Sequence, residues 1–344
     1  MVSKRQGTQI VTIQEIERAC DNSQPLDYSR PELPKSELSL ARTFYPYGFP
    51  VEVKTNSVDV LNVLEGIWGE FEQRYNTVPI NSEVHAVMSD SLDCPPLPVY
   101  RLMSSSFITI ADKNNYGIVD MERNIAQICL SDAALRHKLY AGYYFLGTPI
   151  ACIASSHTTP LHAGCVALDG RGVLLCGDSG AGKSTLSYAC ARKGWTYISD
   201  DKSYLLSCGE DRVVAGNCHR VRFRPTAAEL FPEIGELKMM PPAAGKPSVE
   251  MQTSMIPGLT CSQATKVDFI VFLNRLSEGG QGVTPYRKDV TRHFVRQMLF
   301  GPPNTLDRQY EAIERLLTAD VFELRYKDLN WAVHRLEKLV HDGQ

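Results

Sequence analysis

A run of small residues ending in lysine, serine and threonine is the part of the sequence best suited to chemistry. It fits the pattern G-x-x-x-x-G-K-[ST] and reads Gly177-Asp178-Ser179-Gly180-Ala181-Gly182-Lys183-Ser184-Thr185. Glycines let backbone N–H groups converge on a polyphosphate, and a helix that starts there adds partial positive charge. Lys183 then reaches the terminal phosphates, and the Ser184 hydroxyl binds Mg²⁺. We therefore expect residues 177–185 to bind ATP with Mg²⁺. The alternative is a glycine-rich turn that binds nothing.

Two adjacent carboxylates follow this run. Asp200 and Asp201 end a predicted strand at Thr196–Ser199, and Asp200 lies 17 residues after Lys183. One carboxylate can bind Mg²⁺, directly or through water, and the other can accept a proton from an attacking hydroxyl. Because neighbouring carboxylates repel each other, we expect their titrations to be coupled. The alternative is a solvated turn, where such pairs are common.

The elements around the glycine-rich run must hold these groups in place. A short buried strand, Val173–Cys176, leads into it, and a helix at Lys183–Lys193 follows, with Gly194 as its stop signal. A further strand at His162–Leu168 and a tight turn at Asp169–Gly172 make a β-hairpin that feeds the run. An ordinary phosphate-loop NTPase has a βαβ unit there instead. We therefore expect a mixed sheet rather than a simple doubly wound one.

The first half of the chain predicts an α+β domain, with a polar, proline-containing arm at residues 21–39. Its predicted strands are 44–53, 84–88, 107–111, 116–121 and 125–130, and its predicted helices are 58–75 and 131–145. A polar stretch at residues 155–160 ends in proline and suggests a boundary, so we expect domains at 1–157 and 158–344. The end of the chain predicts helices at 290–299, 306–317 and 329–340 and a strand at 321–325.

Composition excludes several classes of protein. The 344 residues are 43% hydrophobic and 22% charged, with a formal charge of −3, which is typical of a globular chain and not of a general nucleic-acid binder. The longest apolar run, Leu139–Ala154, is too short to span a membrane, and the first residues lack the apolar stretch of a signal peptide. Ten cysteines without a C-x-x-C pair argue against a zinc site. We expect reduced core cysteines in a cytoplasmic protein.

Taken together, these motifs resemble the catalytic domain of the bacterial HPr serine kinase/phosphorylase-like family. The shared features are a histidine in a hairpin, His162, then the GDSGxGKS run and the Asp200-Asp201 pair. The resemblance covers residues 161–340, including the later segments 267–275 and 321–326. It implies an α/β fold of the HPr kinase and phosphoenolpyruvate carboxykinase type, with a mixed sheet and a hairpin before the phosphate loop.

The resemblance also implies roles for single residues. Lys183 and Ser184 would hold phosphates and Mg²⁺, and His162 would lie near the reacting phosphate. We assign Asp201 as the base and Asp200 as the metal-associated carboxylate, and the reverse assignment stays open. Relatives form hexamers, so the resemblance leaves a homo-oligomer as an open expectation.

One family signature, an E-[IV]-R-G-[LI]-G-like run after the Asp pair, is absent, so HPr as acceptor and the phosphorolysis reaction do not carry over. The corresponding region, residues 216–225, instead places arginines on one strand face, where they could meet phosphate or an acidic substrate. The candidates for such contacts are Arg220, Arg222, Arg224, Arg275 and Lys246. Lys246 belongs to a loop at residues 240–247 that, like residues 278–282, could close over the site. The alternative for each is a solvated surface residue.

The sequence thus predicts a Mg²⁺-dependent kinase that transfers the terminal phosphoryl group of ATP to a hydroxyl. The acceptor is a serine of a protein or peptide, or a small hydroxylated metabolite, and the sequence does not choose between them. Two alternatives stay open: a nucleotide-binding regulator without turnover, and a phosphate-loop NTPase with water as acceptor.

Overall fold

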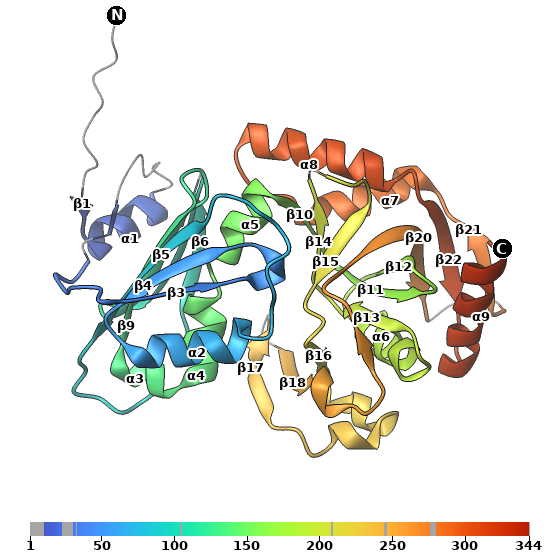
Figure 1. The fold of residues 1–344 in the computed structure, drawn as a ribbon, viewed down its shortest axis with the longest axis horizontal. Helices are drawn as coiled ribbons and strands as arrows, with labels where there is room; N and C mark the ends of the chain where they lie inside the picture. Colours follow the sequence, from blue (N-terminus) through green and yellow to red (C-terminus); the bar gives the residue numbers. More distant parts are fainter. Residues whose placement is uncertain are drawn as a thin grey trace, which may run out of the picture. The chain divides into compact units, whose positions relative to one another are not determined.

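The chain divides into two compact units, Met1–Ser156 and His157–Gln344 (Figure 1). The computed structural model describes residues 10–22, 30–31, 33–103, 105–207, 209–243, 246–275 and 280–343. Within these ranges, no helix is long and apolar enough to cross a membrane.

The first unit is built on a seven-stranded mixed sheet in the order β3-β4-β5-β9-β8-β7-β6. Its strands are β3 (Leu40–Phe44), β4 (Val51–Thr55), β5 (Ile80–Val87), β6 (Val99–Met103), β7 (Ser106–Asp112), β8 (Asn115–Asp120) and β9 (Ile125–Ser131). The neighbours β4, β5 and β9 pair in parallel, and the other neighbours pair antiparallel.

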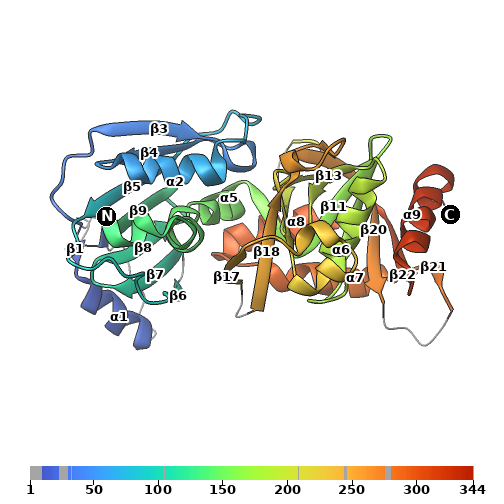
Figure 2. The same cartoon turned by 90° about the horizontal axis from the view of Figure 1, so that it is seen from below.

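Helices cover this sheet, and Figure 2 shows α2 alongside β4 and β5. They are α1 (Ile13–Asp21), α2 (Val58–Trp68), α3 (Asp132–Arg136), α4 (Lys138–Ala141), the π-helical turn η2 (Gly142–Leu146) and α5 (Ile150–Ser156). A small parallel pair joins β1 (Ile10–Val11) and β2 (Arg30–Pro31). Ile16 of α1 packs against Ile108 and Ile118.

Several predictions for this unit need correction. The predicted strand 44–53 is interrupted by a turn at Pro46–Gly48, where Tyr47 and Gly48 have φ of 55° and 89°. The predicted helix 58–75 ends at Trp68, because Gly69 caps it. The predicted helix 131–145 begins at the expected cap, Ser131, but consists of three short segments, α3, α4 and η2. Of the predicted arm 21–39, residues 23–29 and 32 lie outside the described residues, and residues 33–39 form no regular element.

The second unit is built on a ten-stranded mixed sheet. The main path runs β10-β14-β15-β20-β12-β11-β13-β19, and β22 adds to β20 and then pairs with β21. Its strands are β10 (Thr158–Leu161), β11 (Ala163–Leu168), β12 (Arg171–Cys176), β13 (Thr196–Ser199), β14 (Ser203–Leu206), β15 (Val213–Gly216), β19 (Thr260–Cys261), β20 (Ala264–Asn274), β21 (Gly282–Pro285) and β22 (Asp320–Arg325). A separate antiparallel sheet joins β16 (Arg220–Phe223), β18 (Lys246–Gln252) and β17 (Met239–Ala243).

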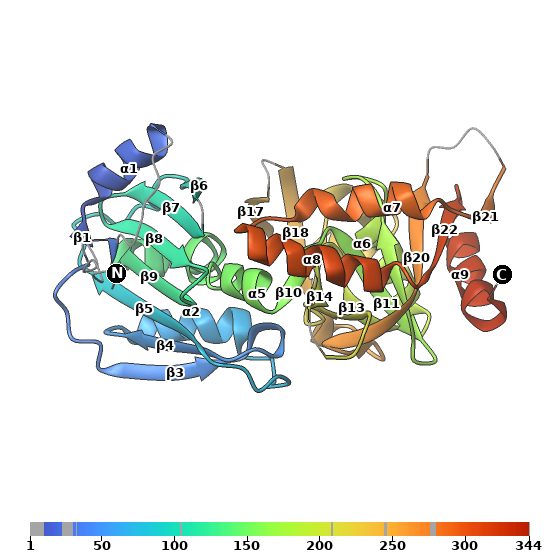
Figure 3. The ribbon, with the colours of Figure 1, turned by 90° about the horizontal axis from the view of Figure 1, so that it is seen from above.

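Both faces of the large sheet are covered. On one face pack α6 (Lys183–Arg192) and α9 (Leu329–Asp342), and on the other α7 (Lys288–Val295) and α8 (Pro303–Leu316), which Figure 3 shows side by side. The strand β12 serves both cores: Val173 and Leu175 point into one, and Leu174 and Cys176 point into the other. A continuous apolar strand buried on both faces is the pattern expected of such a three-layer arrangement.

The predicted hairpin is present, since β11 and β12 pair antiparallel around Asp169 and Gly170, whose φ are 51° and 76°. The predicted C-terminal helices and strand are α7, α8, β22 and α9, and the first predicted helix is shorter, because residues 296–298 form a 3-10 turn. Two cysteines correct the core expectation, because Cys94 and Cys261 are exposed. The other described cysteines are buried thiols, and Cys20 and Cys208 lie outside the described side chains.

Candidate active site

The glycine-rich run leaves the end of β12 and enters α6. Gly177, Gly180 and Gly182 have φ of 148°, 94° and 102°, a region that favours glycine. A Cβ on Gly182 would come within 2.7 Å of the Tyr326 hydroxyl oxygen, so this position also needs the small residue. The backbone thus curls at the N-terminus of a helix, which is the arrangement that binds phosphate.

Lys183 is buried at the start of α6, with 5% of its surface exposed. Its Nζ donates hydrogen bonds to the carbonyl oxygens of Gly177 at 2.7 Å and Asp178 at 3.2 Å. The lysine therefore ties the two ends of the loop together. Burial lowers the pKa of Lys183, and the negative charge of Asp201 opposes that shift.

His162 and Asp201 meet at the same ammonium group. His162 directly precedes β11 and Asp201 follows β13 by two residues, and these strands pair antiparallel. The Lys183 Nζ donates to His162 Nε2 at 3.1 Å, and Asp201 Oδ1 lies 3.3 Å from His162 Nδ1 and 3.9 Å from the Nζ. Because a lysine only donates, His162 Nε2 must accept, which assigns the ring proton to Nδ1, facing Asp201. Burial lowers the pKa of His162, consistent with this neutral form, while the Asp201 charge opposes the shift.

Asp200 directly follows β13 and is partly buried. Its Oδ2 accepts the Arg222 backbone N–H at 3.0 Å, and its carboxylate hydrogen-bonds the Ser184 hydroxyl. Burial is the main cause that raises the pKa of Asp200 to about 6, and the charge of Asp201 adds to this shift. The two hydrogen bonds oppose the shift, because they stabilise the charged form. The hydroxyl and carboxylate oxygens proposed for Mg²⁺ are therefore in contact, and such oxygen ligands suit that ion. Within the described residues, no cluster of three or more His, Cys, Asp or Glu side chains forms a metal site.

The arginines predicted to face substrate lie on β16 or just after it. Arg220 pairs with Glu250 at 2.7 Å, and the Arg222 Nε donates to Ser248 Oγ at 2.9 Å. Arg224 is exposed and donates to the Pro247 carbonyl at 3.3 Å. Glu250 therefore neutralises much of the charge expected from Arg220. The Arg222 backbone N–H makes a contact with Asp200.

The remaining predicted residues lie elsewhere. Lys246 begins β18, but its side chain lies outside the described side chains. Residues 278 and 279 of the second predicted loop lie outside the described residues. Gln281 in that loop accepts the backbone N–H groups of Lys327 and Asp328 at 3.0 and 3.1 Å. Arg275 follows β20 and is exposed beside a cavity.

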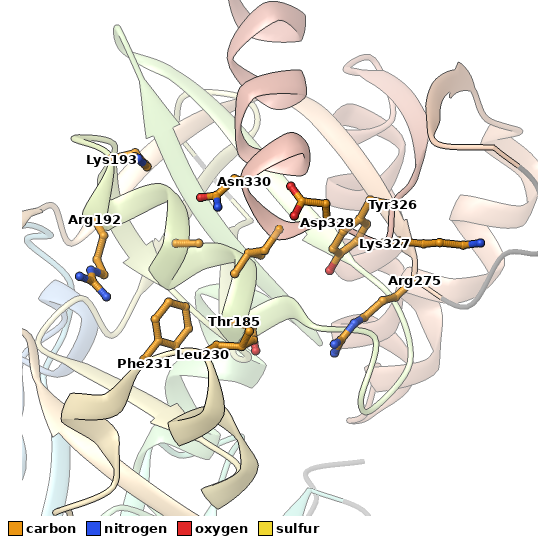
Figure 4. Close-up of a pocket in the computed structure, with 12 residues that line it drawn as sticks. Thr185, Arg192, Lys193, Leu230, Phe231, Arg275, Tyr326, Lys327, Asp328 and Asn330 are labelled. Atoms are coloured by element: carbon orange, nitrogen blue, oxygen red, sulfur yellow. The ribbon is translucent and has the colours of Figure 1, made fainter.

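That cavity, of about 470 Å³, adjoins the first turn of α6 at Thr185 (Figure 4). Its wall is made by Thr185, Ala189, Arg192, Lys193, Leu230, Phe231, Arg275, Tyr326, Lys327, Asp328, Leu329 and Asn330. Sequence reasoning had pointed only to Thr185 and Arg275. The other residues come from distant segments with no shared motif, so no local pattern could have identified them.

No protein family and no curated protein matches this sequence. Among solved structures, the HPr(Ser) kinase/phosphatase from Coxiella burnetii is similar, with a TM-score of 0.29 and 14% sequence identity. The alignment covers 54% of this chain and 95% of that chain. A similarity this weak identifies no family, so the assignment of a function depends on the geometry of the site.

Proposed function

We propose that this chain is a Mg²⁺-dependent kinase that transfers the terminal phosphoryl group of ATP to a hydroxyl. The observation that carries the proposal is the meeting of Lys183, His162 and Asp201 at the glycine-rich loop, with Asp201 within 3.9 Å of the lysine Nζ. A cation for the phosphate and a carboxylate for the acceptor proton thus stand together. Phosphoryl transfer needs little more than such positioning and charge neutralisation.

Each residue has a definite task in the reaction. The loop backbone and the Lys183 ammonium hold the terminal phosphates of the nucleotide. Ser184 and Asp200 are the side chains that would hold Mg²⁺, which neutralises phosphate charge when bound. His162 uses Nδ1–H to orient Asp201, so that the free carboxylate oxygen faces the acceptor.

Asp201 acts as the general base. It takes the proton of the acceptor hydroxyl while the hydroxyl oxygen forms a bond to the terminal phosphorus. The bond from that phosphorus to the bridging oxygen breaks, and ADP leaves with the electron pair. The products are a phosphate ester, ADP and a proton, which Asp201 releases to solvent.

The fold proposed for residues 158–344 is of the HPr kinase and phosphoenolpyruvate carboxykinase type. The hairpin β11–β12 that feeds the loop and the mixed sheet support this proposal. The acceptor is a serine of a protein or peptide or a small hydroxylated metabolite. A cytoplasmic location and a homo-oligomer stay predictions.

An acceptor screen tests the proposal. The protein is incubated with labelled ATP, Mg²⁺ and panels of amino acids, sugars and serine peptides, and ADP and labelled products are followed. We expect acceptor-dependent labelling that Lys183→Ala abolishes and Lys338→Ala, an exposed lysine on α9, leaves intact. Acceptor-independent release of ADP would instead identify a hydrolase. Tight ATP binding without turnover across the panels would identify a regulator.

A further inference from the structure

The cavity beside Thr185 is placed to receive the nucleoside of a nucleotide whose phosphates bind the glycine-rich loop. A polyphosphate bound along residues 177–185 has its nucleoside end near the first turn of α6. Thr185 belongs to that turn and also lines the cavity, so loop and cavity are continuous. This argument rests on the proposed function, because it takes the loop as a phosphate site.

The walls of the cavity suit a flat heterocycle. Leu230 and Phe231 form one side, and Figure 4 shows Asp328 and Asn330 opposite them, at the start of α9. Phe231 is buried and fixed by an edge contact with Tyr188, at 4.8 Å between ring centroids. The rest of the lining is largely polar and includes four cationic side chains, Arg192, Lys193, Arg275 and Lys327. The base would therefore lie against the apolar side of the cavity, with polar groups placed to fix its orientation.

The two polar groups on the α9 side are not equally available. One oxygen of Asp328 accepts the Trp331 backbone N–H at 2.7 Å, so this carboxylate caps the helix. The Asn330 carboxamide is exposed at the rim and makes no hydrogen bond with any described residue. A side chain without a protein partner at the edge of a cavity is free to bind a ligand there.

We infer that Asn330 recognises the base of the donor nucleotide and favours adenine over guanine. A carboxamide offers an acceptor oxygen beside an N–H donor. Adenine offers an amino donor beside the acceptor N7, so two hydrogen bonds form together. Guanine offers two acceptors on the same edge, O6 and N7, so only the amide N–H₂ finds a partner and the amide oxygen faces an acceptor.

Titration calorimetry with Mg²⁺ tests this inference with three probes: ATP, GTP and inorganic tripolyphosphate. We expect the unmodified protein to bind ATP about ten-fold more tightly than GTP, as a bidentate pair allows. Asn330→Ala and the equally sized Asn330→Asp should lose most of that preference, with ATP affinity about ten-fold weaker. Tripolyphosphate reaches only the loop, so its affinity should change less than about two-fold. Lys338→Ala, on an exposed part of α9 away from the cavity, should match the unmodified protein.

The variants Asn330→Ala and Lys183→Ala separate two outcomes: that Asn330 does not recognise the base, and that the loop is not a phosphate site. If Asn330→Ala keeps the ATP affinity and the preference over GTP, Asn330 does not recognise the base. If its tripolyphosphate affinity falls in parallel with its ATP affinity, the variant disturbs the loop and the inference is also overturned. In both cases Lys183→Ala should still abolish binding of ATP and tripolyphosphate. Unchanged binding in Lys183→Ala would overturn the proposed phosphate site itself.

Discussion

Lys183 illustrates how a single residue would suit the proposed phosphate site. A buried ammonium group is costly unless it is hydrogen-bonded, and three acceptors surround this one. Two of them are loop carbonyls and the third is the neutral His162. The negative charge of Asp201 lies slightly further away, at 3.9 Å. The lysine therefore places a positive charge at the loop, which nearby carboxylates, Asp201 foremost and also Asp178 and Asp200, partly balance. Such a charge suits the proposed phosphate site.

The raised pKa of Asp200 predicts a dependence of stability on pH. A carboxyl whose pKa rises from 3.8 to about 6 on folding holds its proton more tightly in the folded state. The folded state is therefore destabilised as pH rises from about 4 to about 6, by about 1–3 kcal/mol in all. Asp200→Asn removes this cost. In buffer with a chelator, thermal unfolding should show the variant gaining more stability over the unmodified protein at pH 7.5 than at pH 4.

An exposed carboxylate provides the control for that experiment. A hydrogen bond from Arg287 lowers the pKa of Asp289, which is the opposite shift. Asp289→Asn should therefore gain no stability at pH 7.5 relative to pH 4. An equal gain of Asp200→Asn at both pH values would contradict the assignment of a raised pKa to Asp200.

Residue types and spacing predicted the loop, the Asp pair and His162 as candidates, because each lies in a short motif. The charge balance of β16 was not predictable in the same way, because Glu250 lies 30 residues from Arg220 and no pattern links them. The cavity residue Asn330 could not be predicted from the sequence for the same reason. Asn330 is singled out by its position beside the cavity, and a single asparagine belongs to no sequence motif.

The element that connects β12 to α6 depends on glycine for two separate reasons. Gly182 has a φ of 102°, and its missing Cβ leaves room for the Tyr326 hydroxyl. Gly194, at the other end of α6, has a similar φ of 92° but open space around it. A Cβ at Gly194 would therefore add backbone strain alone, whereas a Cβ at Gly182 would add strain and also a clash with Tyr326.

Alanine at these two positions should therefore act differently. A positive φ costs roughly 1–2 kcal/mol for a residue with a Cβ, so both variants should unfold at lower temperature. Only Gly182→Ala should also weaken ATP binding, by more than about ten-fold, because its methyl group must displace Tyr326 or the loop. Calorimetry and thermal unfolding of the pair check this. Equal ATP affinity in the two variants would show that the loop does not hold the nucleotide.

Element boundaries were less predictable than element types. The hairpin before the loop followed from its tight turn, where Asp169 and Gly170 take positive φ. The strand β6 was missed because residues 99–102 are all exposed, which removes the alternation that marks a strand. The helix predicted to reach Tyr75 ends at Trp68, although Phe71 beyond it is still buried. The apolar residues beyond Trp68 keep the spacing of a helix because they are buried or half-buried, so the sequence predicts a helix longer than the one observed.

At the scale of the whole molecule, each compact unit has apolar side chains of its own. Val53, Val84 and Ile128 are fully buried in the first unit, and two large clusters fill the second. Every residue assigned to the candidate site lies between His162 and Asn330, and so within the second unit. The sequence pattern placed the chemistry in this half as well, but it offered no role for the first unit.

This division predicts that residues 157–344 fold without the first unit. The shortened chain should unfold cooperatively and bind tripolyphosphate with Mg²⁺ within about three-fold of the full chain, because the loop and its contacts are retained. Thermal unfolding and calorimetry on the two chains provide the comparison. A shortened chain that is folded but does not bind tripolyphosphate would show that the first unit completes the phosphate site.

The rate of phosphoryl transfer by Asp201→Asn tests the central claim most directly. Asparagine keeps the shape of the side chain but cannot take a proton from the acceptor hydroxyl. At saturating ATP, Mg²⁺ and acceptor, we predict that labelled product forms about 10²–10⁴-fold more slowly, while ATP affinity changes less than about three-fold. Transfer at the unmodified rate, with the same acceptor and the same ATP affinity, would contradict the account.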